Sequence, residues 1–224
     1  MPSVAINVGA NTNEPGVRGP VYPDGSFEFV PIPETEPTAE PPPTYADLDL
    51  RIQLPDGVAE TPVHLDPEFR GYPCCERYTY GDPWGVKARP LLSLSAGDYA
   101  LFYATLSPRR ADGSPGLADH PDWVRPEWGA YLVGEFRLAR DPVPGEAYRE
   151  GTLQAEVAAA FAAVLLLGDD ASGLYERPLP LSGGTGADAT EFSEDSGRGP
   201  WWRRPLRFDA AATRTLRERL PPYR

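Results

Sequence analysis

Two segments of alternating apolar residues constrain the fold of this chain most strongly: "DYALFYATL" (98–106) and "GAYLVGEFRLARD" (129–141). On an extended strand, successive side chains point to opposite faces of the sheet. Tyr99, Leu101 and Tyr103 therefore share one face, and Ala100 and Phe102 share the other. Apolar residues on both faces predict two strands that lie inside a β core.

The remaining pattern predicts shorter strands, at 4–8, 27–32 and 173–182, with a strand or short helix at 48–52. Two helices are also expected. One is the Ala- and Leu-rich segment 152–167, which Gly168 would end, and the other is 209–220 with Asp209 as its N-cap. We expect residues 66–82 to be irregular and residues 31–45 to form a Pro-rich acidic arm. The pattern indicates one α+β domain over 1–224.

Composition and charge restrict the classes of partner. The formal net charge is −12, which argues against a general nucleic-acid coat or a binder of anionic membranes, since both need a positive surface. The two cysteines are neighbours, Cys74 and Cys75, so a disulfide scaffold is excluded. The longest apolar run, 157–167, is too short to span a bilayer, and we expect a cytoplasmic protein without membrane contact.

Side-chain amides cluster near the first strand, at Asn7, Asn11 and Asn13. Amides donate and accept hydrogen bonds at once, so they can recognise the edge of a nucleobase or a sugar. They can equally satisfy their own backbone in Asx-turns. Three side chains that follow can extend the wall of a polar pocket: Tyr22, Asp24 and Glu28.

The segment "HLDPEF" (64–69) carries His64, Asp66 and Glu68 at alternate positions, which share one face of an extended chain. An imidazole and two carboxylates on one face can perform acid–base chemistry or bind a divalent metal such as Mg²⁺ or Mn²⁺. Asp82 of "YGD" can add a third carboxylate. The alternative is a turn at Pro67 in which Asp66 caps the backbone.

The C-terminal segment 198–224 is basic within an acidic chain. Its eight arginines face only Asp209 and Glu218, so its local charge is 8 − 2 = +6. Trp201 and Trp202 directly precede Arg203 and Arg204, a combination that can stack on bases and bind phosphates. The same tryptophans can instead pack against the core while the arginines balance acidic neighbours.

Two resemblances to known families follow from these motifs. The order of "GDYALFYATL" and "YLVGEF" resembles PUA-like β-barrels such as the EVE, ASCH and YTH families, which bind RNA or modified bases. The segments "INVGANTN", "GPVYPDGSFEFVPIPE", "HLDPEF", "YTYGDP", "LFYATL" and "YLVGEF" together resemble the third type of nucleotide modification associated domain, a prokaryotic and phage family linked to DNA base modification. The resemblance covers most of the chain, and it places the family motifs on Asn7, Gly9, Asn11, Asn13, Tyr22, Asp24, Glu28, Asp66, Glu68, Tyr80 and Asp82.

The resemblance implies a PUA-like barrel core with a decorated N-terminal arm, and a function connected with modified nucleotides. Our first hypothesis is a module that recognises a modified nucleotide or base in DNA. Its amides would recognise the base edge, Tyr22, Tyr80 or a Trp would stack, and Arg203 and Arg204 would contact phosphate. The second is an enzyme that acts on nucleotides or DNA through His64, Asp66, Glu68 and Asp82, by metal or acid–base chemistry. The third is a purely protein-binding defence component that uses its Pro-rich arm, with proteins of a DNA-modification system as its expected partners.

Overall fold

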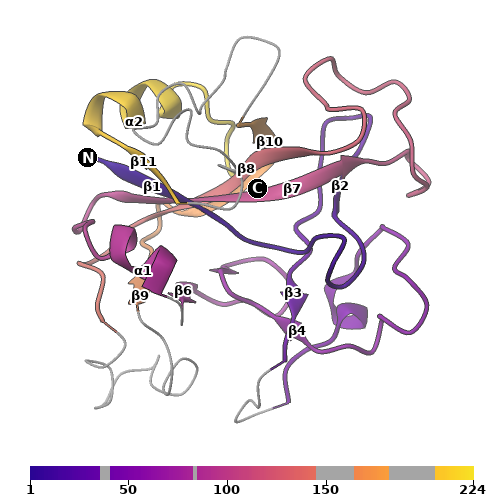
Figure 1. Cartoon of the computed structure of the whole chain (residues 1–224), viewed down its shortest axis with the longest axis horizontal. Coiled ribbons are helices and arrows are strands. Elements are labelled where there is room, and N and C mark those ends of the chain that lie inside the picture. Colours follow the sequence, from indigo (N-terminus) through magenta and orange to yellow (C-terminus); the bar gives the residue numbers. More distant parts are fainter. Residues whose placement is uncertain (36–40, 83–84, 145–163, 182–204) are drawn as a thin grey trace.

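The computed structural model describes residues 1–35, 41–82, 85–144, 164–181 and 205–224. Its elements, in chain order, are β1 (Ser3–Asn7), β2 (Gly19–Val21), β3 (Ile32–Pro33), the 3₁₀ helix η1 (Tyr45–Leu48), β4 (Val63–His64), β5 (Glu68–Phe69), β6 (Tyr78–Asp82), α1 (Gly85–Leu91), β7 (Tyr99–Pro108), β8 (Gly129–Arg137), β9 (Val164–Leu167), β10 (Gly173–Pro180), β11 (Leu206–Phe208) and α2 (Ala210–Arg217). Strands dominate and the helices are short, so the fold is α+β as expected (Figure 1).

A mixed sheet in the order β10-β8-β7-β1-β11 forms the centre of the molecule. β1 pairs in parallel with the first half of β7, and β2 pairs in parallel with its end. β8 lies antiparallel on the other side of β7. Because β1 and β7 are parallel neighbours, the chain between them has to cross over the sheet, and residues 8–98 make this crossover.

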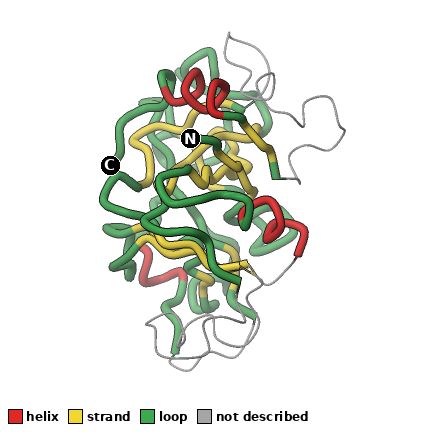
Figure 2. The backbone as a smooth tube through the Cα atoms, turned by 90° about the vertical axis from the view of Figure 1, so that its left-hand side faces the viewer, coloured by secondary structure: helices red, strands yellow, loops and turns green. Residues whose placement is uncertain are grey.

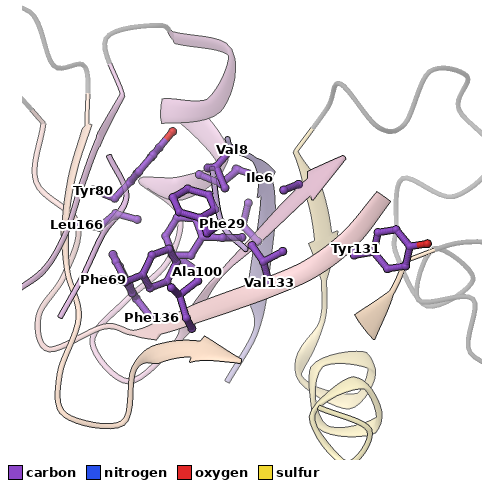
Figure 3. Close-up of a cluster of buried hydrophobic side chains, with 14 of the residues drawn as sticks. Ile6, Val8, Phe29, Phe69, Tyr80, Ala100, Tyr131, Val133, Phe136 and Leu166 are labelled. Atoms are coloured by element: carbon purple, nitrogen blue, oxygen red, sulfur yellow. The ribbon is translucent and has the colours of Figure 1, made fainter. Parts of the chain in front are cut away.

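The two faces of β7 pack into two different cores, as the alternation predicted. Ala100 and Phe102 join the cluster formed with the crossover, and Tyr99, Leu101 and Tyr103 join the cluster beneath α2. Figure 3 shows the first cluster, with Phe29, Phe69 and Phe136 gathered on one side of the sheet and Tyr131 set apart from them.

Aromatic rings fill the first cluster edge to face. The ring centroids of Phe102 and Phe136 lie 4.6 Å apart, and those of Phe69 and Phe102 lie 5.4 Å apart. Such pairs add about 0.5–1.5 kcal/mol each beyond the burial of their area. This core fixes the crossover on the sheet, and with it the short strands that carry the polar residues discussed below.

Two small sheets lie within reach of this core. β3 pairs with β4, and the second sheet has the order β5-β6-β9. In both views α2 lies at the end of the molecule opposite β3 and β4 (Figure 1; Figure 2). The second sheet corrects the expectation that residues 66–82 are irregular, because β5 and β6 pair there and β6 finds its other partner in β9.

The helices agree only in part with the expectation. α2 begins after Asp209, whose Oδ1 accepts the N–H groups of Ala211 and Ala212 at 2.8 Å, so the predicted cap is confirmed. The expected helix 152–167 lies mostly outside the described residues, and its described end, Val164–Leu167, is a strand instead. Pairing with β6 explains this, because tertiary contacts outweigh a modest helix propensity. α1 was not expected, since its segment contains a glycine and Pro90.

The expected closed PUA-like barrel is not confirmed. Among the described strands, β10 and β11 lie at opposite ends of the main sheet order and do not pair with each other, so the sheet stays open. The strand expected around 27–32 is also reduced to the two residues of β3. Among the residues that the structure describes, no helix is long and apolar enough to cross a membrane.

Candidate functional site

An imidazole lies between two carboxylates at the β3–β4 pair. Nδ1 of His64 lies 2.6 Å from Oε2 of Glu34, and its Nε2 lies 3.9 Å from Oδ2 of Asp66. The strand pairing produces this arrangement, because Ile32 pairs with His64 and Glu34 follows β3 directly, its N–H bonded to Pro62 O at 2.9 Å. Sequence reasoning missed Glu34, whose signal was the end of the "PIPE" motif.

Asp66 is held against β6. Both of its carboxylate oxygens accept the N–H of Gly81, at 2.8 and 3.0 Å, and 23% of its side chain is exposed. Burial raises the pKa of the Asp66 carboxyl to about 7, and the negative charge of Asp82 adds to the rise. The charges of His64 and Lys87 and the Gly81 hydrogen bond act on this pKa in the opposite direction. Asp66 therefore exchanges a proton near neutral pH.

Asp82 lies behind this group. Its side chain is only 3% exposed, and its Oδ2 accepts the hydroxyl of Tyr80 at 2.8 Å and lies 3.3 Å from Nζ of Lys87. Burial, together with the charges of Asp82 and Asp66, raises the pKa of the Tyr80 hydroxyl, which stays protonated. We call Glu34, His64, Asp66, Tyr80, Asp82 and Lys87 the polar cluster. Lys87 was also missed, because it lies on the unexpected helix α1.

Glu68 is engaged elsewhere. Its Oε1 accepts the N–H groups of Glu76 and Arg77 at 2.6 and 2.8 Å, and its Oε2 accepts the hydroxyl of Thr79 at 2.9 Å. These contacts hold the loop between β5 and β6. Within the described ranges, no group of three or more His, Cys, Asp or Glu side chains is arranged to hold a metal ion.

The side chains of Asn11 and Asp24 make local turn contacts. Oδ1 of Asn11 accepts the N–H of Asn13 at 2.7 Å, which is an Asx-turn, and Oδ1 of Asp24 accepts the N–H and the hydroxyl of Ser26. Asn7 ends β1 at a partly buried position. Gly9 adopts a φ of 80° there, and a Cβ at this residue would lie 3.1 Å from the Val30 carbonyl oxygen.

Tyr22 and Glu28 form a joint with Arg51. The hydroxyl of Tyr22 donates to Oε2 of Glu28 at 3.0 Å. Arg51 donates its backbone N–H and its Nε to Oε1 of Glu28 at 2.9 and 3.0 Å, and its guanidinium lies 3.9 Å from the centre of the Tyr22 ring. The carboxylate of Glu28 is thus neutralised, and Arg51 is fixed beside an aromatic face.

A hollow of about 330 Å³ opens next to this joint. Its lining combines aromatic rings with three arginines: Phe27, Glu28, Phe29, Leu48, Asp49, Leu50, Arg51, Arg70, Gly71, Tyr72, Pro73, Tyr78, Gly173, Leu174 and Arg224. The volume is within the range of small-molecule sites in proteins. Sequence reasoning had placed none of Arg51, Arg70 and Arg224 at a site, because segments far apart in the chain bring them together.

The arginines of the hollow differ in their partners. Nη1 of Arg70 lies 2.7 Å from Oδ1 of Asp170, and its guanidinium lies 4.9 Å from the centre of the Tyr78 ring. Arg224 donates to the carbonyls of Phe27 and Tyr175 and covers the Phe27 ring at 4.2 Å. In the part of the chain that the structure describes, Arg224 has no ion pair.

The expected stacking residues Trp201 and Trp202, and the expected phosphate contacts Arg203 and Arg204, lie outside the described residues. In comparison with known proteins, a family model described as nucleotide modification associated domain 3 matches residues 3–218. No curated protein and no solved structure matches the chain.

Proposed function

We propose, because this chain belongs to the nucleotide modification associated domain 3 family, that it recognises a modified nucleotide or base of DNA in the hollow. One observation carries the proposal: aromatic rings and three arginines line the same small cavity. A base has an apolar face that stacks on aromatic rings, and a phosphate suits the planar donor fork of arginine. The expected partners are therefore nucleotides or modified DNA, and the proteins of a DNA-modification system.

The contacts of the lining residues indicate which part of a nucleotide each of them would bind. Arg70 and Arg224 would meet the phosphate, since the first lies at an exposed ion pair and the second has only neutral oxygen partners among the described residues. Tyr72 and Tyr78 offer rings to the base. The hydroxyl of Tyr72 is already used, because it donates to Phe29 O at 2.6 Å, so this residue contributes its ring and not its hydroxyl.

Calorimetric titration with nucleoside monophosphates, with and without a substituent on the base, tests this proposal. Removing one charged hydrogen bond costs about 1.5–3 kcal/mol, so Arg70→Gln and Arg224→Gln should each weaken the binding of a monophosphate roughly tenfold or more. The corresponding nucleoside should bind the variants and the parent protein alike. Arg89→Gln, an exposed arginine of α1, is the matched control. Equal affinity of the parent protein and both hollow variants for every nucleotide would refute the proposal.

The polar cluster favours a second candidate, an enzyme that moves a proton on a nucleotide or on DNA. Its specific support is the spatial arrangement of Glu34, His64 and Asp66. The carboxylate of Glu34 orients the imidazole, and burial raises the pKa of Asp66 to about 7. A metal-dependent version would need Mg²⁺ or Mn²⁺ at these carboxylates.

This candidate is tested by incubating modified nucleotides and oligonucleotides with the protein and analysing the products by mass spectrometry. A new product that depends on the parent protein, and that disappears with His64→Gln and Asp66→Asn, is expected. A thermal-shift titration with each metal separates the two versions, because only the metal-dependent one predicts stabilisation that Asp66→Asn removes. Unchanged product formation by both variants would exclude the polar cluster as the site of the reaction.

A further inference from the structure

Two arginines outside the hollow are half-buried, and the described part of the chain places no counter-ion beside them. Arg18 and Arg109 are only partly exposed, and the described residues provide no ion pair for either. The Nε atom of each is buried and has no hydrogen-bond acceptor within the ranges that the structure describes. Removing a cation from water is costly unless an anion compensates it, so buried arginines are normally paired. In a chain of net charge −12, two arginines that flank one strand pair and find no ion pair among the described residues indicate an anionic ligand.

The register places both arginines on one face of the β2–β7 pair. Arg18 directly precedes β2, and Arg109 directly follows β7 and donates its N–H to Val21 O at 2.9 Å. Val21 pairs with Pro108, so the next residue, Tyr22, lies across from Arg109. Arg18 and Tyr22 are four residues apart. An even spacing places both side chains on the same face of an extended strand, and four residues span about 13 Å of it. The two cations are therefore spaced along a line and not gathered at one point.

Aromatic rings accompany the arginines along this line. The guanidinium of Arg18 lies 4.9 Å from the centre of the Trp128 ring, and that of Arg51 lies 3.9 Å from the centre of the Tyr22 ring. Arg109 lies close enough to Tyr22 for its charge to act on the Tyr22 hydroxyl. Arg51 also lines the hollow, so the line of Arg18, Arg109 and Arg51 leads into it. We call this line the arginine track.

We propose that the arginine track binds the phosphates of a single-stranded nucleic acid, one base of which enters the hollow. The proposal rests on the proposed function of the hollow and names the polymer as its ligand. Proteins bind unpaired strands by combining cations, which hold the phosphates, with aromatic rings, on which the bases stack. Along the track, Tyr22 is buried and supports Arg51 from below, so the ring offered to a base is that of Trp128, which is 36% exposed. A duplex offers no free base face to these rings, and its higher charge density is repelled more strongly by an acidic protein.

Fluorescence anisotropy of labelled DNA and RNA single strands of about 12 nucleotides, titrated at several salt concentrations, tests the track. Each phosphate contact on a single strand contributes about 0.7 to the slope of log affinity against log salt. The double variant Arg18→Gln/Arg109→Gln should therefore lower the slope by about 1.4 and weaken strand binding, while calorimetric affinity for a mononucleotide stays unchanged. Arg89→Gln/Arg214→Gln, which removes two exposed arginines from α1 and α2, should bind the strand like the parent protein.

A parental slope in Arg18→Gln/Arg109→Gln would overturn the proposal, and so would a duplex, or a phosphopeptide of equal charge, that binds as tightly as the single strand. The charge-preserving variant Arg18→Lys/Arg109→Lys guards against misfolding, because it should keep the slope. Comparison of the DNA and RNA strands identifies the source of the phosphates. Unchanged mononucleotide binding in Arg70→Gln, together with a lower salt slope in Arg18→Gln/Arg109→Gln, would reject the hollow and leave the track.

Discussion

The raised pKa of Asp66 makes the stability of the fold depend on pH in a defined direction. In the unfolded chain this carboxyl titrates near its ordinary value of 3.8, and in the folded protein it titrates at about 7. Below about pH 4 the carboxyl is protonated in both states, and its burial then does not lower the free energy of unfolding. Between about pH 4 and about pH 7 the folded protein binds more protons than the unfolded chain, so its stability falls as the pH rises. Above that window the full cost is present.

The size of the effect follows from the shift. Each pKa unit corresponds to about 1.4 kcal/mol, so the rise from 3.8 to about 7 corresponds to roughly 4 kcal/mol. This is an upper bound, because 23% of the side chain contacts solvent. The substitution Asp66→Asn preserves the shape and an oxygen acceptor for the Gly81 N–H but cannot ionise. The stability of Asp66→Asn relative to the parent protein should therefore increase with pH across this window, by up to about 4 kcal/mol.

Urea unfolding of both proteins, followed by circular dichroism between about pH 4.5 and about pH 8, measures this difference. Asp56→Asn, which removes an exposed carboxylate from a turn, is the control and should show a constant difference from the parent protein. Parallel stability curves for Asp66→Asn and the parent protein would show that burial does not hold the proton on Asp66.

Three further perturbations have effects that the structure determines. Arg217→Ala removes the partner that lies 3.1 Å from Oε1 of the buried Glu135, and about 3 kcal/mol of stability should be lost in urea unfolding, since a buried carboxylate loses its counter-ion. Gly134→Ala places a Cβ 2.7 Å from the carbonyl oxygen of Gly173, and a loss of about 1–3 kcal/mol, with a lower thermal midpoint, is expected from the forced backbone shift. Asp209→Ala removes the N-cap of α2 and should cost about 1 kcal/mol in the same assay, whereas Asp209→Asn should restore most of it. No change in Arg217→Ala, Gly134→Ala or Asp209→Ala would contradict the ion pair, clash or cap described for that residue.

Local patterns accounted for the long strands and the C-terminal helix. The alternation at Tyr99–Leu106 predicted which side chains of β7 share a face, and Asp209 predicted where α2 begins. The same reasoning failed for Val164–Leu167, whose composition favours a helix but whose position beside β6 makes it a strand. It also could not show that the sheet stays open, since closure depends on which strands meet at the edges.

Local sequence likewise predicted one part of the candidate site, and tertiary structure alone assembled the other. The spacing within "HLDPEF" is a short-range feature, and His64 and Asp66 do lie close to each other. Glu34, which follows β3, and Lys87, which lies on α1, complete the polar cluster, and only strand pairing and the crossover bring them there. The three arginines of the hollow come from segments between residues 51 and 224, so no sequence window contains them.

By itself, the sequence determined which segments alternate, where one helix is capped and which titratable groups are near neighbours. These properties follow from steric and hydrogen-bonding rules that act over a few residues. The tertiary structure alone decided the pKa of Asp66, the partner of His64 and the lack of an ion pair for Arg18 and Arg109 among the described residues. Each of these depends on burial and on charges contributed by distant parts of the chain, and both exist only after the crossover has packed on the sheet.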